Sequence, residues 1–149
     1  MTRLGLIADT HGLIRPQALV ALGGCDRILH AGDIGEGDIL EALAAIAPVE
    51  AVPGNCDDLP GLPTDRILDV GGVRILLRHG HLPEPGAHGA DVVVSGHTHV
   101  PLVVRDGATL RVNPGSAGPR RFRLPVTVAI LELGEGEPRA EIVELDLGP

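Results

Sequence analysis

The sequence predicts an α/β fold in which two mixed β-sheets pack together as a sandwich, with helices outside. Three observations lead to this class. Short apolar runs alternate with two helix-like segments up to Val52, apolar runs paired around glycine-rich turns fill the rest, and polar side chains follow many of these runs. At 149 residues with 44% hydrophobic side chains, the chain is the size of one domain. We therefore expect a single domain over residues 1–149.

The first third of the chain reads as strand, helix, strand. Residues Leu4 to Ala8 are continuously apolar, which is typical of a strand that is covered on both faces. Pro16 suits the first turn of a helix, and the pair Gly23-Gly24 would end that helix. Arg27 to His30 then predicts a second strand.

A second helix and a third strand complete a β-α-β-α-β unit. Asp38 is a plausible N-cap for a helix that runs through Ile46, and Pro48 follows its end. Val49 to Val52 predicts the third strand. Such a unit implies parallel strands, whose carboxyl ends meet at one edge of the sheet, where open α/β sheets bind their ligands.

From Asp58 onward the pattern predicts strand pairs. One strand is expected at residues 91–94, just before two histidines. Residues 82–90 contain too much proline and glycine for a full helix, so we expect a loop or a very short helical turn at 82–90. The expected pairs are 66–70 with 73–78, 102–105 with 109–112, and 126–133 with 139–145.

Composition excludes several function classes. The net charge of −8 argues against nucleic acid and anionic membranes as partners, because both reward a cationic surface. The N-terminal apolar run is too short for a signal peptide or a membrane span, so we expect a cytoplasmic protein. Cys25 and Cys56 do not form a disulfide framework, and we expect reduced thiols.

Potential metal ligands follow five of the predicted strands. Histidine is the commonest transition-metal ligand, and carboxylate and amide oxygens complete such sites. A site with these ligands would suit Mn, Fe, Zn or Ni better than Mg or Ca. Two such ions could activate a bridging water for phosphoester hydrolysis. The full set is Asp9, His11, Asp33, Asn55, His79, His97 and His99.

The motifs around these residues resemble those of a known family. Asp-Thr-His, Gly-Asp, Gly-Asn-Cys-Asp, His-Gly-His and Gly-His-Thr-His occur between residues 9 and 99, and Asn-Pro-Gly-Ser begins at Asn113. In this order they resemble the calcineurin-like metallophosphoesterases, specifically the small bacterial and archaeal phosphodiesterase branch. The resemblance implies the same α/β sandwich and a binuclear site, with Mn the leading candidate. It assigns metal one to Asp9, His11, Asp33 and His99, and metal two to Asp33, Asn55, His79 and His97.

Two departures from the family pattern bear on function. Many relatives carry histidine after the Gly-Asn pair, where it assists the leaving group, but this chain has Cys56. A thiol is a poorer proton donor and brings no imidazolium charge, so we expect esters with good leaving groups to be favoured. Relatives also usually place a helix at residues 82–90, and its loss would leave one flank of a sheet open or available to a second copy of the chain.

Several further residues are candidates for lesser roles. His81 could orient the site or contact phosphate, and the choice of His79 over His81 as ligand rests on the resemblance. Asp57 could hold a ligating histidine or shape the turn beside Asn55. Arg120, with the neighbouring Arg121 and Arg123, could bind a substrate phosphate or lie in a solvated loop. We expect His30 to be buried and hydrogen-bonded, and His88 to be solvated.

The leading function is therefore a metal-dependent phosphodiesterase in which hydroxide between the metals is the nucleophile and Asp33, Asn55, His81, Cys56 and Asp57 assist. We expect a small phosphoester substrate, with Asn55, His81 and Arg120 as its contacts. A phosphomonoesterase or nucleotide phosphatase is an alternative that the same ions could support. A non-catalytic protein-binding scaffold is another, since the retromer scaffold branch of the superfamily keeps the fold.

Overall fold

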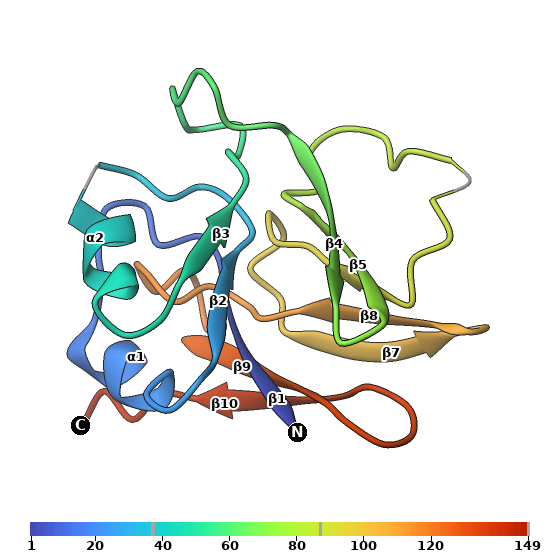
Figure 1. Ribbon diagram of the computed structural model, residues 1–149. Coiled ribbons are helices and arrows are strands. Elements are labelled where there is room, and N and C mark those ends of the chain that lie inside the picture. The colour runs from blue at the N-terminus through green and yellow to red at the C-terminus, as the bar shows by residue number, and fades with distance from the viewer. Residues whose placement is uncertain (37, 87, 149) are drawn as a thin grey trace.

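The computed structural model describes residues 1–36, 38–86 and 88–148, and it confirms the predicted sandwich of two mixed sheets (Figure 1). The first sheet has the order β10 (Arg139–Glu144), β9 (Thr127–Leu133), β1 (Thr2–Ile7), β2 (Arg27–His30) and β3 (Val49–Ala51). The second has the order β4 (Asp65–Val70), β5 (Val73–Arg78), β6 (Val92–Val94), β8 (Thr109–Asn113) and β7 (Leu102–Asp106). Each predicted strand is present, with differences only at the ends.

Both helices cover the first sheet, on the side away from the second (Figure 1). Helix α1 (Pro16–Ala21) begins at Pro16, as predicted. Helix α2 (Asp38–Ala44) differs from expectation. Asp38 is its first residue and not its N-cap, and the N-cap position falls outside the described residues. The helix also ends before Ile46, whose N–H turns to the Leu43 carbonyl and so tightens the last turn. No helix among the described residues is long and apolar enough to cross a membrane.

Each sheet contains three neighbouring parallel strands. In the first sheet β1 pairs in parallel with β2, and β2 with β3, as the β-α-β-α-β pattern predicts. In the second sheet β5 pairs in parallel with β6, and β6 with β8. The carboxyl ends of six strands therefore supply loops to one region, three from each sheet.

Two hydrophobic layers hold this arrangement. Between the sheets, fully buried side chains such as Leu6 and Leu29 pack against Ile75 and Val92. Beneath the helices, Ile28 packs with Leu22 and Leu43 in a second cluster. With aliphatic side chains filling both layers, the sheets hold their strand ends in a constant relative position.

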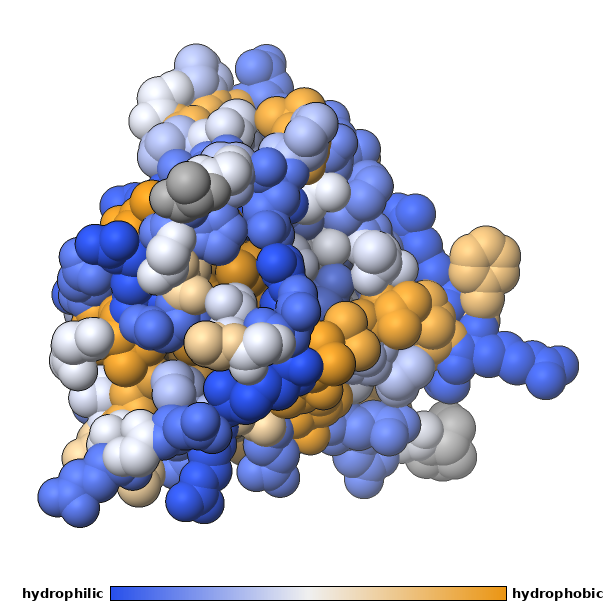
Figure 2. Space-filling view, turned by 90° about the vertical axis from the view of Figure 1, so that its right-hand side faces the viewer, coloured by the Kyte–Doolittle hydropathy of each residue, from blue (hydrophilic) through white to orange (hydrophobic). Residues whose placement is uncertain are grey.

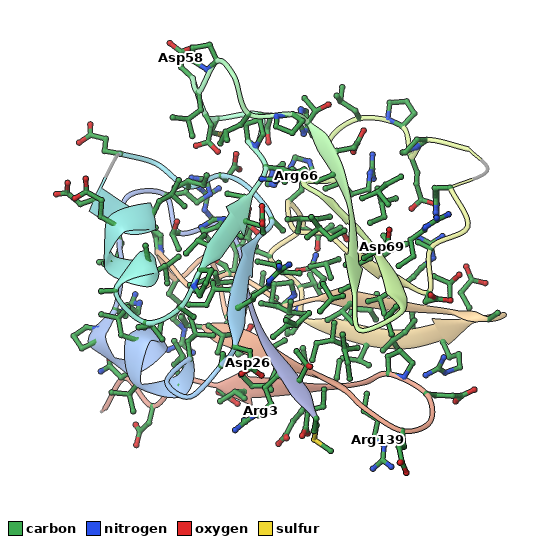
Figure 3. All side chains as sticks on the ribbon, viewed as in Figure 1. Arg3, Asp26, Asp58, Arg66, Asp69 and Arg139 are labelled. Carbon is green, nitrogen blue, oxygen red and sulfur yellow. The ribbon has the colours of Figure 1, made fainter. Side chains whose placement is uncertain are left out.

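Polar contacts tie the sheets at their margins. At the amino ends of β1 and β2, the Arg3 N–H donates to the Asp26 carboxylate at 2.8 Å, and the two residues lie close together in Figure 3. Arg66 on β4 forms an ion pair with Glu50 on β3 and so joins the two sheets, and its position between these strands is visible in Figure 3. The first contact lies at the end of the strands opposite the site, and the second holds the two sheets together.

The 82–90 connection is a loop in its described part, and it folds back over the outer face of the second sheet. Arg78 donates to the Leu82 carbonyl, and Arg111 holds the Glu84 carboxylate with N–O distances of 2.6 and 3.0 Å. The expectation that His88 is solvated is wrong, because its ring lies 3.3 Å from Glu84 and accepts the Ala90 N–H.

This loop leaves part of the outer face uncovered. Leu76 and Val93 are buried beneath it, whereas Val100, Leu102 and Val104 at the edge strand β7 are 42–49% exposed. Figure 2 shows hydrophobic side chains gathered in a stripe on this side of the molecule. The sequence left this flank either open or available to a second copy of the chain, and a homodimer stays a prediction.

Candidate metal centre

The structure brings the seven predicted ligands together at the carboxyl ends of the parallel strands. Asp9 and His11 follow β1, Asp33 follows β2 and Asn55 follows β3. His79 follows β5, and His97 and His99 follow β6. The histidines of the second sheet thus face the carboxylates of the first. The site lies between the two sheets, so neither sheet alone could form it.

The first group of ligand atoms surrounds His79. Its Nδ1 lies 2.8 Å from the Ala31 carbonyl, and only a protonated nitrogen makes that contact, so Nε2 carries a lone pair. That Nε2 lies 3.3 Å from Asp33 Oδ2, 3.0 Å from Asn55 Oδ1 and 3.2 Å from His97 Nδ1. Burial lowers the pKa of His79 and keeps the ring neutral. Potential ligand atoms of four side chains therefore lie close together, as they would around a cation.

The second group contains Asp9, His11 and His99, whose ligand atoms all lie within 4.8 Å of one another. His99 Nε2 is 3.7 Å from Asp9 Oδ1. Burial, followed by the negative charge of Asp33, raises the pKa of Asp9 to about 7. His11 Nε2 is buried and has no hydrogen-bond partner among the described residues.

Asp33 lies between the two groups. Its Oδ2 is 3.3 Å from His79 Nε2 and 3.6 Å from His11 Nε2. Buried carboxylates that repel each other and an imidazole nitrogen that lacks a partner are the features that divalent cations would compensate. The residues present therefore fit a pair of divalent ions, with the Asp33 carboxylate positioned between them.

Backbone strain is concentrated at these residues. Six non-glycine residues of the described chain have positive φ, and five of them are predicted ligands: Asp9, His11, Asp33, His97 and His99. The left-handed conformation costs an ordinary residue about 1–2 kcal/mol. Such strain collects at functional sites, where the surrounding structure maintains it.

Hydrogen bonds between the loops maintain this conformation. The N–H groups of Asp9 and His11 donate to the carbonyls of Gly32 and Asp33, each at 2.9 Å, which joins the first two loops. The His97 N–H donates to the Asp9 carboxylate at 3.1 Å and joins the two sheets. Asn113 at the end of β8 donates to the Gly96 carbonyl and the Thr98 hydroxyl, both at 3.0 Å, and so fixes the loop that carries His97 and His99.

The Asp57 side chain shapes the turn beside Asn55 and does not hydrogen-bond a predicted histidine ligand among the described residues. Its carboxylate accepts the N–H groups of Ile34, Gly35 and Gly54 at 2.8–3.0 Å, and it therefore ties the Asp33 loop to the Asn55 loop. Burial alone would raise the pKa of Asp57, but these three backbone donors keep it below the usual range.

His30 is buried and hydrogen-bonded, as expected. Its Nδ1 accepts the Gly32 N–H at 3.1 Å, so Nε2 carries the proton and donates to the Thr10 hydroxyl at 3.0 Å. Thr10 in turn donates to the Ile34 carbonyl. Complete burial lowers the pKa of His30 to about 3, which keeps the ring neutral behind the site.

His81 and Cys56 lie beside the ligands. The His81 ring centroid is 5.4 Å from that of His79, and its buried Nδ1 has no partner in the described part of the chain. It is His79, and not His81, whose nitrogen groups with Asp33 and His97. Cys56 is exposed at the mouth of the site, and its N–H donates to Asp33 Oδ1 at 2.9 Å.

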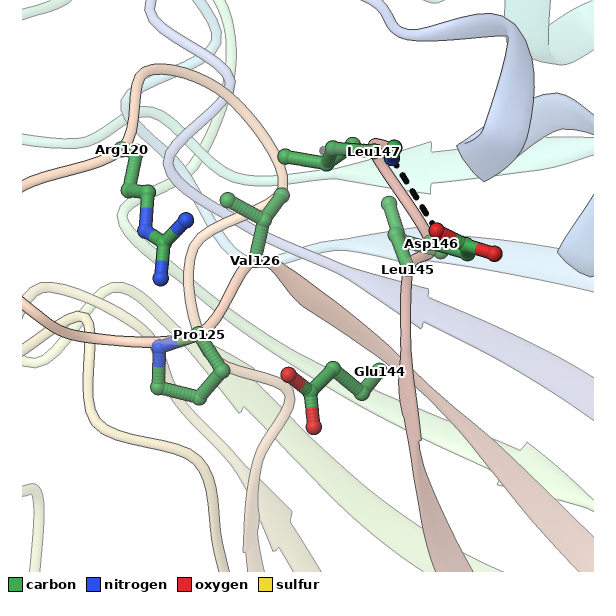
Figure 4. A pocket seen from close by; sticks show the side chains of 8 residues that line it. Arg120, Pro125, Val126, Glu144, Leu145, Asp146 and Leu147 are labelled. Carbon is green, nitrogen blue, oxygen red and sulfur yellow. Dashed lines mark hydrogen bonds between the residues drawn. The ribbon is translucent and has the colours of Figure 1, made fainter.

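Arg120 lies elsewhere. It lines a pocket with Val126, Glu144 and Leu145 near the C-terminus, and no predicted ligand lines that pocket (Figure 4). The charge of its neighbour Arg121 reaches the site: it partly opposes the burial that raises the pKa of Asp9, and it adds to the burial that lowers the pKa of His99. The sequence alone could not separate these adjacent arginines, whose surroundings depend on how the loop folds.

Sequence reasoning gave no role to Asn113. The Asn-Pro-Gly-Ser run was visible as part of the resemblance, but its function depends on β8 lying beside β6, which the sequence did not show. Asparagine at the end of a strand, followed by Pro-Gly, was the available signal.

Gly54 provides a direct test of how closely the loops pack. A Cβ atom there would lie 2.1 Å from Asp33 Oδ1 and 2.4 Å from the Asp33 nitrogen. We expect Gly54→Ala to displace Asp33 and to weaken metal binding by about 10–100-fold, as disturbing a ligand's support typically does. Isothermal titration with Mn²⁺ or Zn²⁺ would measure this. Gly86→Ala, where a Cβ meets open space, is the matched control, and equal affinities in the two variants would contradict the prediction.

The His30 network predicts acid sensitivity. The folded pKa near 3 lies below the unfolded value near 6.5, so between these values the unfolded chain binds a proton that the folded chain does not. The free energy of unfolding should therefore fall as the pH drops from about 6.5 towards 3, by up to about 1.4 kcal/mol per pH unit for this group. Urea denaturation in EDTA at pH 7, 6, 5 and 4 should show a shallower fall in His30→Gln. Parallel pH profiles in the two proteins would contradict the prediction.

Comparison with known proteins agrees with this geometry. Residues 2–136 match the calcineurin-like phosphoesterase superfamily domain. A probable metallophosphoesterase of Methanothermobacter thermautotrophicus is 36% identical over 157 residues, covering 94% of this chain and 91% of that protein.

Two further proteins are similar in structure. Phosphodiesterase YfcE of Escherichia coli is 29% identical in sequence over 89% of this chain and 88% of its own. Its solved structure superposes with a TM-score of 0.68 at 27% identity over 88% of each chain. Vps29 of Entamoeba histolytica, solved with Zn²⁺, shares the fold with a TM-score of 0.79 at 23% identity over 96% of this chain and 99% of its own. The chain belongs to the calcineurin-like phosphoesterase superfamily.

Proposed function

We propose that this chain is a phosphodiesterase that uses two divalent metal ions. The observation that carries the proposal is the pair of ligand groups, one with Asp9, His11 and His99 and one with His79 and His97, on either side of the Asp33 carboxylate. Two ions bound at such a site would polarise a phosphoryl oxygen and lower the pKa of the water that attacks phosphorus.

The side chains divide into two ligand sets. Asp9, His11, Asp33 and His99 would hold one ion, and Asp33, Asn55, His79 and His97 the other. The hydrogen bond from His79 Nδ1 to the Ala31 carbonyl fixes the ring and presents Nε2 to the site. In the same way, the His97 N–H fixes the Asp9 carboxylate.

Other side chains would receive the substrate. Asn55 is exposed and lies next to His79, so its amide can also contact a phosphate oxygen. His81 has a free Nδ1 beside the same ring and can donate to a second oxygen. Arg121 brings positive charge from the loop that follows Gly118, and in this role we propose it in place of Arg120.

Mixed carboxylate and imidazole donors suit Mn, Fe, Zn or Ni better than Mg or Ca. We keep Mn as the leading ion and a small phosphodiester as the substrate. A phosphomonoesterase could use the same ligands, and the substrate series below separates the two activities.

Elemental analysis and activity with each metal would test the proposal. Purified protein, stripped and reloaded with Mn, Ni, Zn or Fe, should bind two ions per chain and hydrolyse bis-p-nitrophenyl phosphate faster than p-nitrophenyl phosphate. His97→Ala should lower the rate by at least about 100-fold, since it removes a ligand and not merely an outer partner. Failure of the wild type to bind any of these metals would refute the proposal, whereas faster hydrolysis of the monoester would favour the phosphomonoesterase.

Cys56 should make the reaction sensitive to the leaving group. Desolvation and then the negative charge of Asp33 raise the pKa of this thiol, which makes it a weaker proton donor still. Aryl diesters should therefore react much faster than alkyl diesters. Cys56→His should accelerate the alkyl substrates by about 100-fold, the lower end for general acid catalysis, and leave aryl rates nearly unchanged.

The measurement is the slope of log rate against leaving-group pKa in the wild type and in Cys56→His. Cys25→Ala, at a buried cysteine that packs with the helices, is the matched control. A flat dependence in the wild type would contradict this prediction.

A further inference from the structure

In the proposed reaction, Cys56 matters only because its thiol is a poor proton donor. Its sulfur forms a third group of potential ligands with His11 and Asp33, in which one ligand atom of each residue lies within 4.8 Å of the others. The residue is exposed at the open side of the site, while Asp33 is buried behind it. The sulfur therefore faces the space that the ion shared by His11 and Asp33 would fill.

The loop positions Cys56 firmly. Its N–H donates to Asp33 Oδ1 at 2.9 Å, and the Asn55 amide lies 3.8 Å from the sulfur. Asp57, the next residue, is anchored by three backbone N–H groups. With its backbone joined to a ligand and its neighbour fixed, the side chain is held beside the His11 and Asp33 ligand atoms.

A second feature points to a ligand at the same place. His11 Nε2 is buried without a hydrogen-bond partner in the described chain and lies 3.6 Å from Asp33 Oδ2. A nitrogen, an oxygen and a sulfur thus lie close together, and among the described residues the nitrogen makes no hydrogen bond to either of the other two. Nitrogen and sulfur donors together are the set that borderline-soft divalent ions prefer.

We propose that Cys56 is a direct thiolate ligand to the ion held by His11 and Asp33. The inference rests on the proposed function, because it requires that an ion binds there. On binding, the S–H bond breaks, the proton passes to solvent, and the sulfur lone pair forms the bond to the ion. In the free chain the neighbouring carboxylate disfavours the thiolate, and the charge of a divalent cation reverses that effect.

Two consequences follow for the site. A thiolate ligand shifts the preference of metal one from Mn towards Zn or Co, so the two positions would differ in metal selectivity. A sulfur bonded to the ion also has no proton to offer a leaving group. The ligand role therefore explains, in one contact, both the sensitivity to the leaving group and the choice of ion.

Cobalt and zinc provide readouts that do not depend on turnover. In Co²⁺-loaded wild-type protein we expect the intense near-ultraviolet absorption of a sulfur-to-cobalt charge transfer. X-ray absorption of the Zn²⁺-loaded protein should show a sulfur neighbour at about 2.3 Å. Both signals should persist in Cys25→Ala and vanish in Cys56→Ser, which should still bind two ions per chain. The Zn²⁺ affinity of metal one should fall by at least about tenfold in Cys56→Ser, with a much smaller change for Mn²⁺.

The outcomes separate this inference from the proposed function. Two bound ions with no sulfur signal in the wild type would overturn the ligand role of Cys56 and leave the binuclear site intact. A sulfur signal that survives in Cys56→Ser would also overturn the assignment. If the wild type binds no metal under any condition, the proposed function itself fails and this inference fails with it.

Discussion

The structure of the site depends on two buried carboxylates, Asp9 and Asp33, that face imidazole nitrogens. Burial, and then the repulsion from Asp33, raises the pKa of Asp9 to about 7. His79 cannot relieve the repulsion, because its proton is committed to the Ala31 carbonyl. Divalent cations are the partners that would compensate both carboxylates at once.

The rest of the fold maintains this arrangement. Five ligand residues have left-handed backbone conformations, and hydrogen bonds between neighbouring loops keep them there. Close packing makes the loops rigid: Gly54 leaves no room for a side chain beside Asp33, and Gly96 none beside Ala8. Outside the ligands, Asp57 and Asn113 connect loops that would otherwise move separately. The two aliphatic layers supply the stability that this strain requires.

The sequence predicted most of the fold because local signals agreed. Pro16 and the glycine pair after α1 marked that helix, and apolar runs marked the strands. The sequence was less informative where contacts between residues far apart in the chain determine the structure. The sequence placed Asp38 before the first residue of α2, one residue later than the helix begins. It could not show that His88 pairs with Glu84, because that pairing depends on Arg111, which holds Glu84 from another strand. Long-range folding likewise places Arg120 in a pocket away from the ligands, while the charge of Arg121 reaches Asp9 and His99.

By itself the sequence determined the ligand types, their order, and the convergence of Asp9, Asp33 and Asn55, since a β-α-β-α-β unit places parallel strand ends at one edge. It also determined that a thiol stands at residue 56. Only the tertiary structure decided that β5, β6 and β8 form a second parallel set facing the first, because strand order within a sheet is a long-range property. That packing brings His79, His97 and His99 to the carboxylates, whereas the Cys56 sulfur meets His11 and Asp33 among the loops of the first sheet.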